Sequence, residues 1–211
     1  MKRIYIFILI IIFGILIFIL IGPNIRGIWT AIRPPVGDIA KIIDTPENPL
    51  ILPSGFSISI YADNLVDPRV MIFDQQKNII VSIPSEGKIV LIPNKSSSKI
   101  NKLITLLSNL NRPHGLALYC KIDCKLYVAE TNAVSAYDYD FNNLTLTNRK
   151  MLFDLPSGGN HFSRTLLIEN IDGEDKLLIS VGSSCNVCNE TDIFRAKILS
   201  SNLNGGDLKV F

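Results

Sequence analysis

From Gly55 onward the chain is a series of short apolar segments separated by turn residues, with almost no helical periodicity. We group these segments in fours: FSISIYA, VMIFD, NIIVSIP and GKIVLIP; then KLITLL, HGLALY, KLYVAE and AVSAYDY; then KMLFDL, RTLLIE, KLLISVG and AKILSSN. The third segments carry residues 79–81, 126–128 and 178–180, which are spaced by 47 and then 52 residues. Groups of four strands that recur about every 40 to 50 residues predict a β-propeller, in which each group forms one blade. A β-sandwich of short strands is the alternative, but it does not explain the grouping in fours.

Two proline turns support this repeat. Asp67-Pro68-Arg69 in the first group corresponds to Arg112-Pro113-His114 in the second. Each reads as a turn that leads into a strand. We therefore expect an all-β fold, a partial β-propeller of about three four-stranded blades.

The first residues of the chain predict a membrane anchor. Residues 4–21 read IYIFILIIIFGILIFILI, 18 residues without a charge. As a helix they would reach about 27 Å, close to the thickness of the hydrocarbon layer of a bilayer. We expect residues 1–3 to be a short cytoplasmic tail and 4–22 a transmembrane helix. A cleaved signal peptide is the alternative, but its apolar region is usually about 7 to 15 residues and a small-x-small site follows it, which is absent here.

The segment between the anchor and the repeat has a different composition. Prolines are frequent in residues 23–50 and disfavour a long helix there. We expect a proline-rich stalk over 23–50 and the partial propeller over 51–211.

The cysteines indicate the compartment. Cys120 and Cys124 form one close pair and Cys185 and Cys188 another, and all four follow the predicted anchor. Close pairs at strand ends suit local disulfides in an oxidising compartment. A zinc site would need all four thiolates together, and the second pair lacks the histidine that haem attachment requires. We expect a single-pass membrane protein whose globular part is extracytoplasmic.

Two motifs resemble a known family. GGNHFSRTLLI and SVGSSCNVC are similar to segments of the glucose/sorbosone dehydrogenase family, and a more diffuse likeness covers residues 51–211. Members are six-bladed β-propellers that oxidise sugars with the quinone cofactor PQQ and bind calcium. The resemblance implies that this chain carries the amino-terminal half and that most of the PQQ-binding and calcium-binding residues lie beyond Phe211. We accordingly expect the chain to be inactive alone and to need a partner chain that supplies the missing blades.

The resemblance also assigns roles to individual residues. It puts His161 at the catalytic position, at the start of the second strand of the third group, where it would take a hydroxyl proton from the sugar. From the residues alone, a histidine bonded to a loop carbonyl is the alternative. Arg164 would hold a carboxylate of the quinone or a sugar oxygen, or else form an ion pair between blades. We expect His114 to line the turn or channel without a chemical role, and Glu130 either to orient a polar group in the channel or to be an exposed loop carboxylate.

Other classes of function are disfavoured. The net charge is +2 and there is no basic stripe interleaved with aromatic residues, so we expect no nucleic-acid partner. No phosphate-binding loop, dinucleotide fingerprint, serine elbow or HExxH motif occurs. We expect a membrane-anchored PQQ-dependent sugar dehydrogenase that transfers hydride from a sugar carbon to the quinone. The alternatives are a non-catalytic propeller module that binds a sugar or a protein, and a lactonase-like hydrolase, which would need a cluster of carboxylates in the channel.

Overall fold

The computed structural model describes residues 53–55, 58, 60–94 and 102–211. The predicted cytoplasmic tail, the transmembrane anchor over 4–22 and the stalk over 23–50 lie outside these residues. Across the part of the chain that is described, there is no helix of sufficient length and apolarity to cross a membrane.

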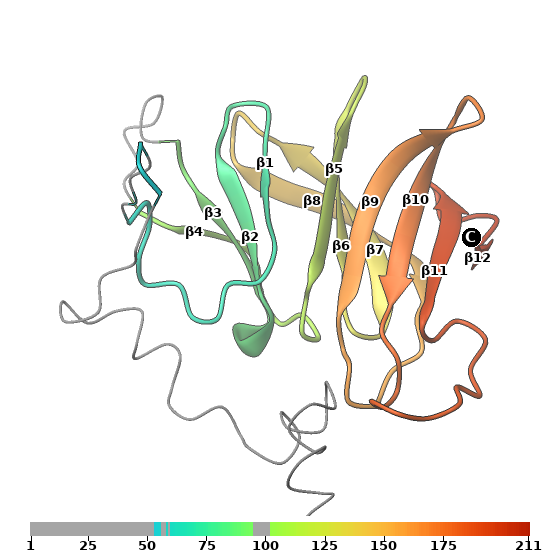
Figure 1. Ribbon diagram of the computed structural model, residues 1–211. Coiled ribbons are helices and arrows are strands. Elements are labelled where there is room, and N and C mark those ends of the chain that lie inside the picture. The colour runs from blue at the N-terminus through green and yellow to red at the C-terminus, as the bar shows by residue number, and fades with distance from the viewer. Residues whose placement is uncertain (1–52, 56–57, 59, 95–101) are drawn as a thin grey trace, which may run out of the picture. The chain divides into compact units, whose positions relative to one another are not determined.

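The described residues form three four-stranded antiparallel sheets, each built from strands consecutive in the sequence (Figure 1). Sheet one contains β1 (Met71–Phe73), β2 (Ile79–Ile83), β3 (Lys88–Ile92) and β4 (Ile104–Leu107), and a short 3-10 turn, Pro84–Glu86, joins β2 to β3. Sheet two contains β5 (Gly115–Cys120), β6 (Cys124–Ala129), β7 (Ala133–Asp140) and β8 (Thr145–Asp154). Sheet three contains β9 (Arg164–Ile171), β10 (Glu174–Val181), β11 (Lys197–Asn202) and β12 (Lys209–Val210). The predicted repeat of four strands is thus confirmed.

The predicted grouping, however, was wrong by one strand. The described residues of FSISIYA form no strand, and KLITLL forms β4, which closes sheet one instead of opening sheet two. Ile104 pairs with Leu91 of β3, so backbone hydrogen bonding assigns β4 to the sheet before it. A repeat length determines the period of a pattern but not its starting point. Consequently His161 precedes β9, the first strand of its sheet, and does not begin a second strand.

Sheet two packs between the other two sheets. Its first strand, β5, contacts β1 of sheet one and β9 of sheet three (Figure 1). Alternate residues of β6 point to opposite faces of the sheet. Leu126 and Val128 are buried in the cluster shared with sheet one, and Tyr127 and Ala129 in the cluster shared with sheet three. Burial on both faces explains why this strand is almost continuously apolar.

Gly115 permits the close contact between β5 and β9. A Cβ atom at this position would clash with the backbone oxygen of Arg164. Any larger residue would therefore push the two strands apart. The glycine of the RPHG turn is required by the packing of one sheet on the next.

Hydroxyl groups connect the sheets at their edges. Tyr139 Oη of β7 donates a 2.7 Å hydrogen bond to the buried carboxylate of Asp74, which follows β1. Tyr127 Oη donates to the backbone oxygen of Leu203 after β11, at 3.1 Å. Ser82 Oγ at the end of β2 donates to the backbone oxygen of His114 at 2.9 Å. The last of these bonds holds His114, which precedes the first strand of sheet two, against sheet one.

Candidate functional site

The residues that precede the first strands of the three sheets meet at one place. Arg69 precedes β1, Arg112 and His114 precede β5, and Phe162 precedes β9. The Arg112 guanidinium carbon lies 3.6 Å from the centre of the Phe162 ring, and that of Arg69 lies 5.9 Å from it. The His114 ring meets the Phe162 ring edge to face, with the centres 6.0 Å apart. We call these four residues the Phe162 cluster.

The Phe162 cluster carries positive charge without a matching carboxylate. Arg69 and Arg112 are exposed, and within the described residues neither forms an ion pair or a side-chain hydrogen bond. Contact with an aromatic face stabilises a guanidinium but leaves its N–H donors unused. The cluster can therefore bind an anionic or oxygen-rich ligand.

His114 is held in the neutral form. Burial lowers its pKa, and the positive charges of Arg69 and Arg164 act in the same direction, against a hydrogen bond to the Arg164 backbone. Its Nδ1 is buried and has no hydrogen-bond partner among the described residues. His114 lies in the segment that leads into β5, and its expected lack of a chemical role stays a prediction.

His161 lies next to the Phe162 cluster in sequence and is half-buried. Its Nδ1 is 2.8 Å from Ser183 Oγ and 3.2 Å from the Ser183 backbone oxygen. Ser183 follows β10, and its neighbour Gly182 passes so close that a Cβ there would come within 3.0 Å of the His161 Cβ. The small residue at 182 therefore brings the Ser183 loop against the imidazole. The catalytic role of His161 stays a prediction.

Arg164, three residues further on, is fully buried. Its guanidinium donates to the backbone oxygens of Pro156 at 2.7 Å, Ser163 at 2.8 Å and His161 at 3.3 Å. Burial and the nearby Arg195 lower its pKa to about 10, which leaves it charged at neutral pH. The buried guanidinium of Arg164 thus holds the loop that carries His161 in place. Ligand binding by Arg164 stays a prediction.

Arg195 stabilises the same loop from another direction. It is buried, and its Nη2 donates to the backbone oxygens of Ser157 and Gly158 at 2.7 Å and of Pro156 at 3.2 Å. Two buried guanidinium groups therefore bind the carbonyls of residues 156–158. The sequence analysis did not single out Arg195, because it lies in the long loop before β11.

The four cysteines form the two predicted disulfides. Cys120 is bonded to Cys124 across the hairpin of β5 and β6, and Cys185 is bonded to Cys188 in the loop after β10. Each bond is local, so the alternative of a shared zinc site is excluded. No group of three or more metal-binding side chains occurs in the residues that the structure describes.

Glu130 acts inside the fold. Its side chain is buried, so the expectation of an exposed loop carboxylate was wrong. It accepts a 2.6 Å hydrogen bond from the backbone N–H of Asn111 and pairs with Arg149 at 3.2 Å. Glu130 thereby fixes the backbone directly before Arg112.

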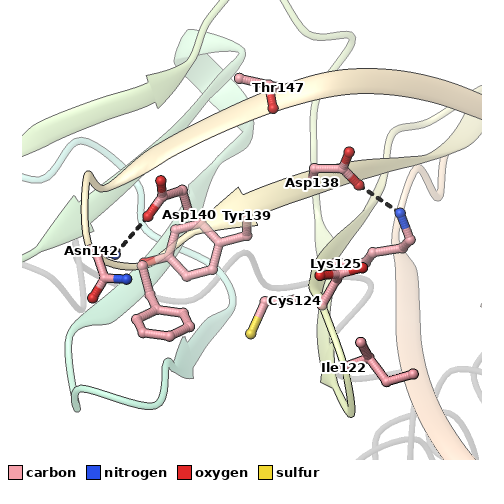
Figure 2. A pocket seen from close by; sticks show the side chains of 10 residues that line it. Ile122, Cys124, Lys125, Asp138, Tyr139, Asp140, Asn142 and Thr147 are labelled. Carbon is pink, nitrogen blue, oxygen red and sulfur yellow. Dashed lines mark hydrogen bonds and ion pairs between the residues drawn. The ribbon is translucent and has the colours of Figure 1, made fainter.

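Two hollows lie away from the Phe162 cluster. One, of about 480 Å³, lies beside Ile122 and Cys124 at the tip of the β5–β6 hairpin (Figure 2). Two of its acidic groups are already paired: Asp138 with Lys125, and Asp140 with the backbone of Asn142 (Figure 2). The other, of about 460 Å³, shares the hairpin tip and extends to Leu203. Neither hollow is lined by His161, Arg164, His114 or Glu130.

Comparisons with known proteins identify the family of this chain. Its three sheets match solved structures of an AA12 carbohydrate-active enzyme, of the PQQ domain of a pyranose dehydrogenase and of a PQQ-bound aldose sugar dehydrogenase. The pattern of the TrAA12-like family matches residues 50–198, and the chain belongs to that family. The membership inferred from GGNHFSRTLLI and SVGSSCNVC is thus confirmed.

Three solved structures illustrate the likeness. An enzyme of carbohydrate-active family AA12 from Trichoderma reesei has a TM-score of 0.62 and 20% identity, with 75% of this chain and 43% of that chain covered. The PQQ domain of pyranose dehydrogenase from Coprinopsis cinerea has a TM-score of 0.56 and 20% identity, with 65% and 34% covered. The PQQ-bound aldose sugar dehydrogenase from Streptomyces coelicolor has a TM-score of 0.50 and 18% identity, with 68% and 47% covered.

The chain therefore spans less than half the length of these structures. At this level of identity the likeness establishes the fold alone. A comparison with curated proteins gives no significant match.

The sequence analysis missed most of the Phe162 cluster. It paired the turn of Arg69 with that of His114 only as evidence for the repeat. The available signal was an arginine within each proline turn and an aromatic residue directly after His161. Nothing in their spacing showed that the three turns meet, because contacts between sheets depend on packing over long sequence distances.

Proposed function

We propose that this protein is the amino-terminal part of a PQQ-dependent sugar dehydrogenase, in which His161 removes the proton of a sugar hydroxyl. The observation that carries the proposal is that His161 directly precedes Phe162, the ring on which Arg69 and Arg112 lie without a carboxylate partner in the described chain. The matched structures include a pyranose dehydrogenase and an aldose sugar dehydrogenase, which supports a sugar as the substrate.

The residues present fit the cofactor. PQQ is a planar aromatic quinone that carries several carboxylates. Guanidinium groups recognise carboxylates through paired hydrogen bonds, and the exposed donors of Arg69 and Arg112 meet this need. The half-buried Phe162 ring adds an aromatic surface between them. These three residues would hold the cofactor.

The chemistry divides between the cofactor and the chain. The cofactor, when bound, would supply the acceptor for the hydride of the sugar carbon. His161 accepts the hydroxyl proton of the same carbon, so that the carbonyl product can form. Arg164 and Arg195 hold the backbone around residues 156–163 and thus keep His161 in place. Arg69 and Arg112 hold negative charge next to the reacting group.

The proposed enzyme also requires further blades and calcium. Because the chain spans less than half of each matched structure, we expect additional blades to supply the remaining cofactor contacts. The outward face of sheet three is available for such contact: Leu167 and Ile198 are 54% and 51% exposed. Calcium is implied by the family resemblance, and we derive no step through it.

A reconstituted chain tests the activity. The full chain is combined with a partner that supplies the remaining blades, PQQ and calcium, and reduction of a dye is followed with a panel of aldoses. His161→Ala should lower kcat by about two to four orders of magnitude, the usual effect of a positioned general base. His114→Ala should cost far less. Equal losses in both variants, or full activity without His161, would refute the catalytic assignment.

The same panel distinguishes the alternative function. A non-catalytic propeller module would bind sugar without turnover, and its binding would be unaffected by PQQ. Calorimetric titration with the sugars, in the presence and absence of PQQ, separates the two. Sugar affinity that is independent of PQQ, with no dye reduction, would favour the binding module.

We further propose that the chain is anchored in a membrane through residues 4–22, with its globular part in an oxidising, extracytoplasmic compartment. The uncharged run of 18 residues and the two disulfides support this. The chain should stay in the membrane fraction after a carbonate wash, and deletion of residues 1–22 should release it. A mature chain that starts between residues 23 and 40 would show a cleaved signal peptide instead.

A further inference from the structure

The loop that follows β10 surrounds one nitrogen of His161 with oxygen atoms. Nδ1 lies 2.8 Å from Ser183 Oγ and 3.2 Å from the Ser183 backbone oxygen. The Ser183 hydroxyl in turn donates a 3.0 Å hydrogen bond to the backbone oxygen of Cys185. Cys185 is one half of the disulfide with Cys188, so the loop is closed two residues beyond Ser183.

These contacts determine which ring nitrogen carries the proton. A hydroxyl has a single proton, and here it is directed to the Cys185 carbonyl. Ser183 Oγ is then an acceptor, and the Ser183 carbonyl can only be an acceptor. A protonated Nδ1 satisfies both. An unprotonated Nδ1 would place its lone pair against the oxygen of the Ser183 carbonyl. The Ser183 hydroxyl would then donate to Nδ1, and the Cys185 carbonyl would lose its hydrogen-bond donor.

The consequence is a free lone pair on the other nitrogen. In neutral imidazole one nitrogen is a donor and the other an acceptor, and the partner of the first decides the tautomer. A proton on Nδ1 leaves Nε2 as the atom that can receive a proton. A hydroxyl group and a short disulfide loop thus do the work that an acidic residue does in many histidine-containing sites.

The rest of the loop is built to keep Ser183 in place. The backbone N–H of Asn160 donates to the Ser184 oxygen at 2.8 Å, which joins this loop to the one carrying His161. The backbone N–H of Ser184 donates to the Glu190 carboxylate at 2.6 Å. Gly182 permits the close approach to His161. The oxygens around Nδ1 are therefore fixed from both sides.

We propose that Ser183, held by the Cys185–Cys188 loop, is a positioning residue that keeps His161 in the Nδ1–H tautomer and so makes Nε2 the base. This proposal rests on the proposed function, because it specifies which atom of His161 would take the sugar proton. The tautomer itself is a property of this chain and can be measured without sugar, cofactor or partner.

Nitrogen NMR of the full chain tests the tautomer. The chain has only two histidines, so selective ¹⁵N labelling gives two sets of ring signals, and His114→Gln assigns them. The chain is studied in detergent micelles, above the pH at which its histidines titrate. His161 should show a protonated Nδ1 and an unprotonated Nε2. A protonated Nε2 in the unmodified chain would overturn the proposal.

Three variants at neighbouring serines test the hydroxyl. Ser183→Ala removes the 2.8 Å contact and leaves only the carbonyl at 3.2 Å, so the ratio of Nδ1–H to Nε2–H should fall by about two- to tenfold, the net effect of one hydrogen bond. Ser183→Thr keeps the hydroxyl and should restore the ratio. Ser184→Ala, whose hydroxyl contacts Cys188 and not His161, should leave it unchanged. An unchanged ratio in Ser183→Ala would overturn the role of the hydroxyl.

The disulfide is tested with a matched pair. Cys185→Ala/Cys188→Ala should lower the same ratio, because the Cys185 carbonyl is no longer held beside Ser183. Cys120→Ala/Cys124→Ala removes the other disulfide, at the β5–β6 hairpin, and should not change it. Backbone amide spectra identify any variant that has lost its sheets. Equal effects of the two pairs, or no effect of the first, would overturn the part assigned to the loop.

The outcomes are independent of the enzyme assay. A chain that shows the Nδ1–H tautomer but, when reconstituted with the remaining blades, PQQ and calcium, oxidises no aldose would refute the proposed function and leave the positioning role standing. A chain with His161-dependent activity but the Nε2–H tautomer would do the reverse.

Discussion

At the scale of single residues, the two histidines have very different surroundings. His114 sits among cationic groups, with its Nδ1 buried and unpaired within the described chain. His161 has its Nδ1 against the oxygens of Ser183. The surroundings of His114 disfavour protonation of its ring, whereas the contacts of His161 favour a proton on Nδ1. A histidine that is prevented from charging suits a lining role, whereas a histidine with an oriented ring suits proton transfer.

The environment of His114 predicts a pH dependence of stability. Its pKa is lowered in the fold by burial, together with Arg69 and Arg164, from about 6.5 in an unfolded chain. The unfolded state therefore binds more protons as the pH falls below that value, and the free energy of unfolding must decrease. Urea denaturation should show this decrease in the free energy of unfolding as the pH is lowered from about 8 to about 5.

The control for that prediction removes the titrating side chain. His114→Gln should make the free energy of unfolding less dependent on pH in this range. If His114→Gln leaves the pH profile as it is, then another group causes the loss of stability, and the burial of His114 has no such effect.

At the scale of secondary structure elements, sheet two holds the described fold together. Its strands bury side chains on both faces, and its tyrosines reach into both neighbours. Tyr139 bonds to Asp74 of sheet one, and Tyr127 bonds to the backbone after β11 of sheet three. Apolar contact supplies most of the stabilisation, and the hydroxyl groups set the alignment of one sheet on the next.

These two tyrosines predict unequal losses of stability. Tyr139→Phe removes a donor from a buried carboxylate and should lower the free energy of unfolding by about 1.5 to 3 kcal/mol. Tyr127→Phe removes a longer bond to a neutral carbonyl and should cost about 0.5 to 1.5 kcal/mol. Urea denaturation at neutral pH measures both. A larger loss in Tyr127→Phe would show that the charge of Asp74 does not strengthen its bond.

At the scale of the whole molecule, the outward face of sheet three remains uncovered in the described part of the chain. Leu167 pairs with Leu178, and Ile198 pairs with Ser180, so these residues share the face opposite to the buried one. Phe211 continues the register beside Ile198 and is 65% exposed. An apolar sheet face of this kind normally packs against another sheet.

This face predicts association. The full chain in detergent should self-associate or bind the partner that supplies further blades. Leu167→Lys combined with Ile198→Lys should raise the dissociation constant at least about tenfold, because each side chain loses an apolar contact. Sedimentation analysis measures the effect. Met151→Lys, at an exposed position on sheet two, is the control and should change little; an equal effect there would contradict the assignment of the face.

Much of this fold can be predicted from the sequence. Short apolar segments such as KLYVAE and KLLISVG predicted strands that the structure contains, because the burial of a strand on one or both faces is recorded in its local pattern of apolar residues. The close spacing of the cysteines predicted both disulfides, because a short loop keeps the two thiols within reach. The motif around His161 indicated the family.

Only the tertiary structure decided the remaining features. KLITLL joined the preceding sheet because its partner is β3, and a repeat length does not specify a partner. Arg164 is buried against carbonyls, although its sequence neighbours do not distinguish this from exposure. The meeting of Arg69, Arg112 and Phe162, and the approach of Ser183 to His161, join residues from different turns. Local sequence determines which strands form, whereas the packing of distant turns determines which side chains share a site.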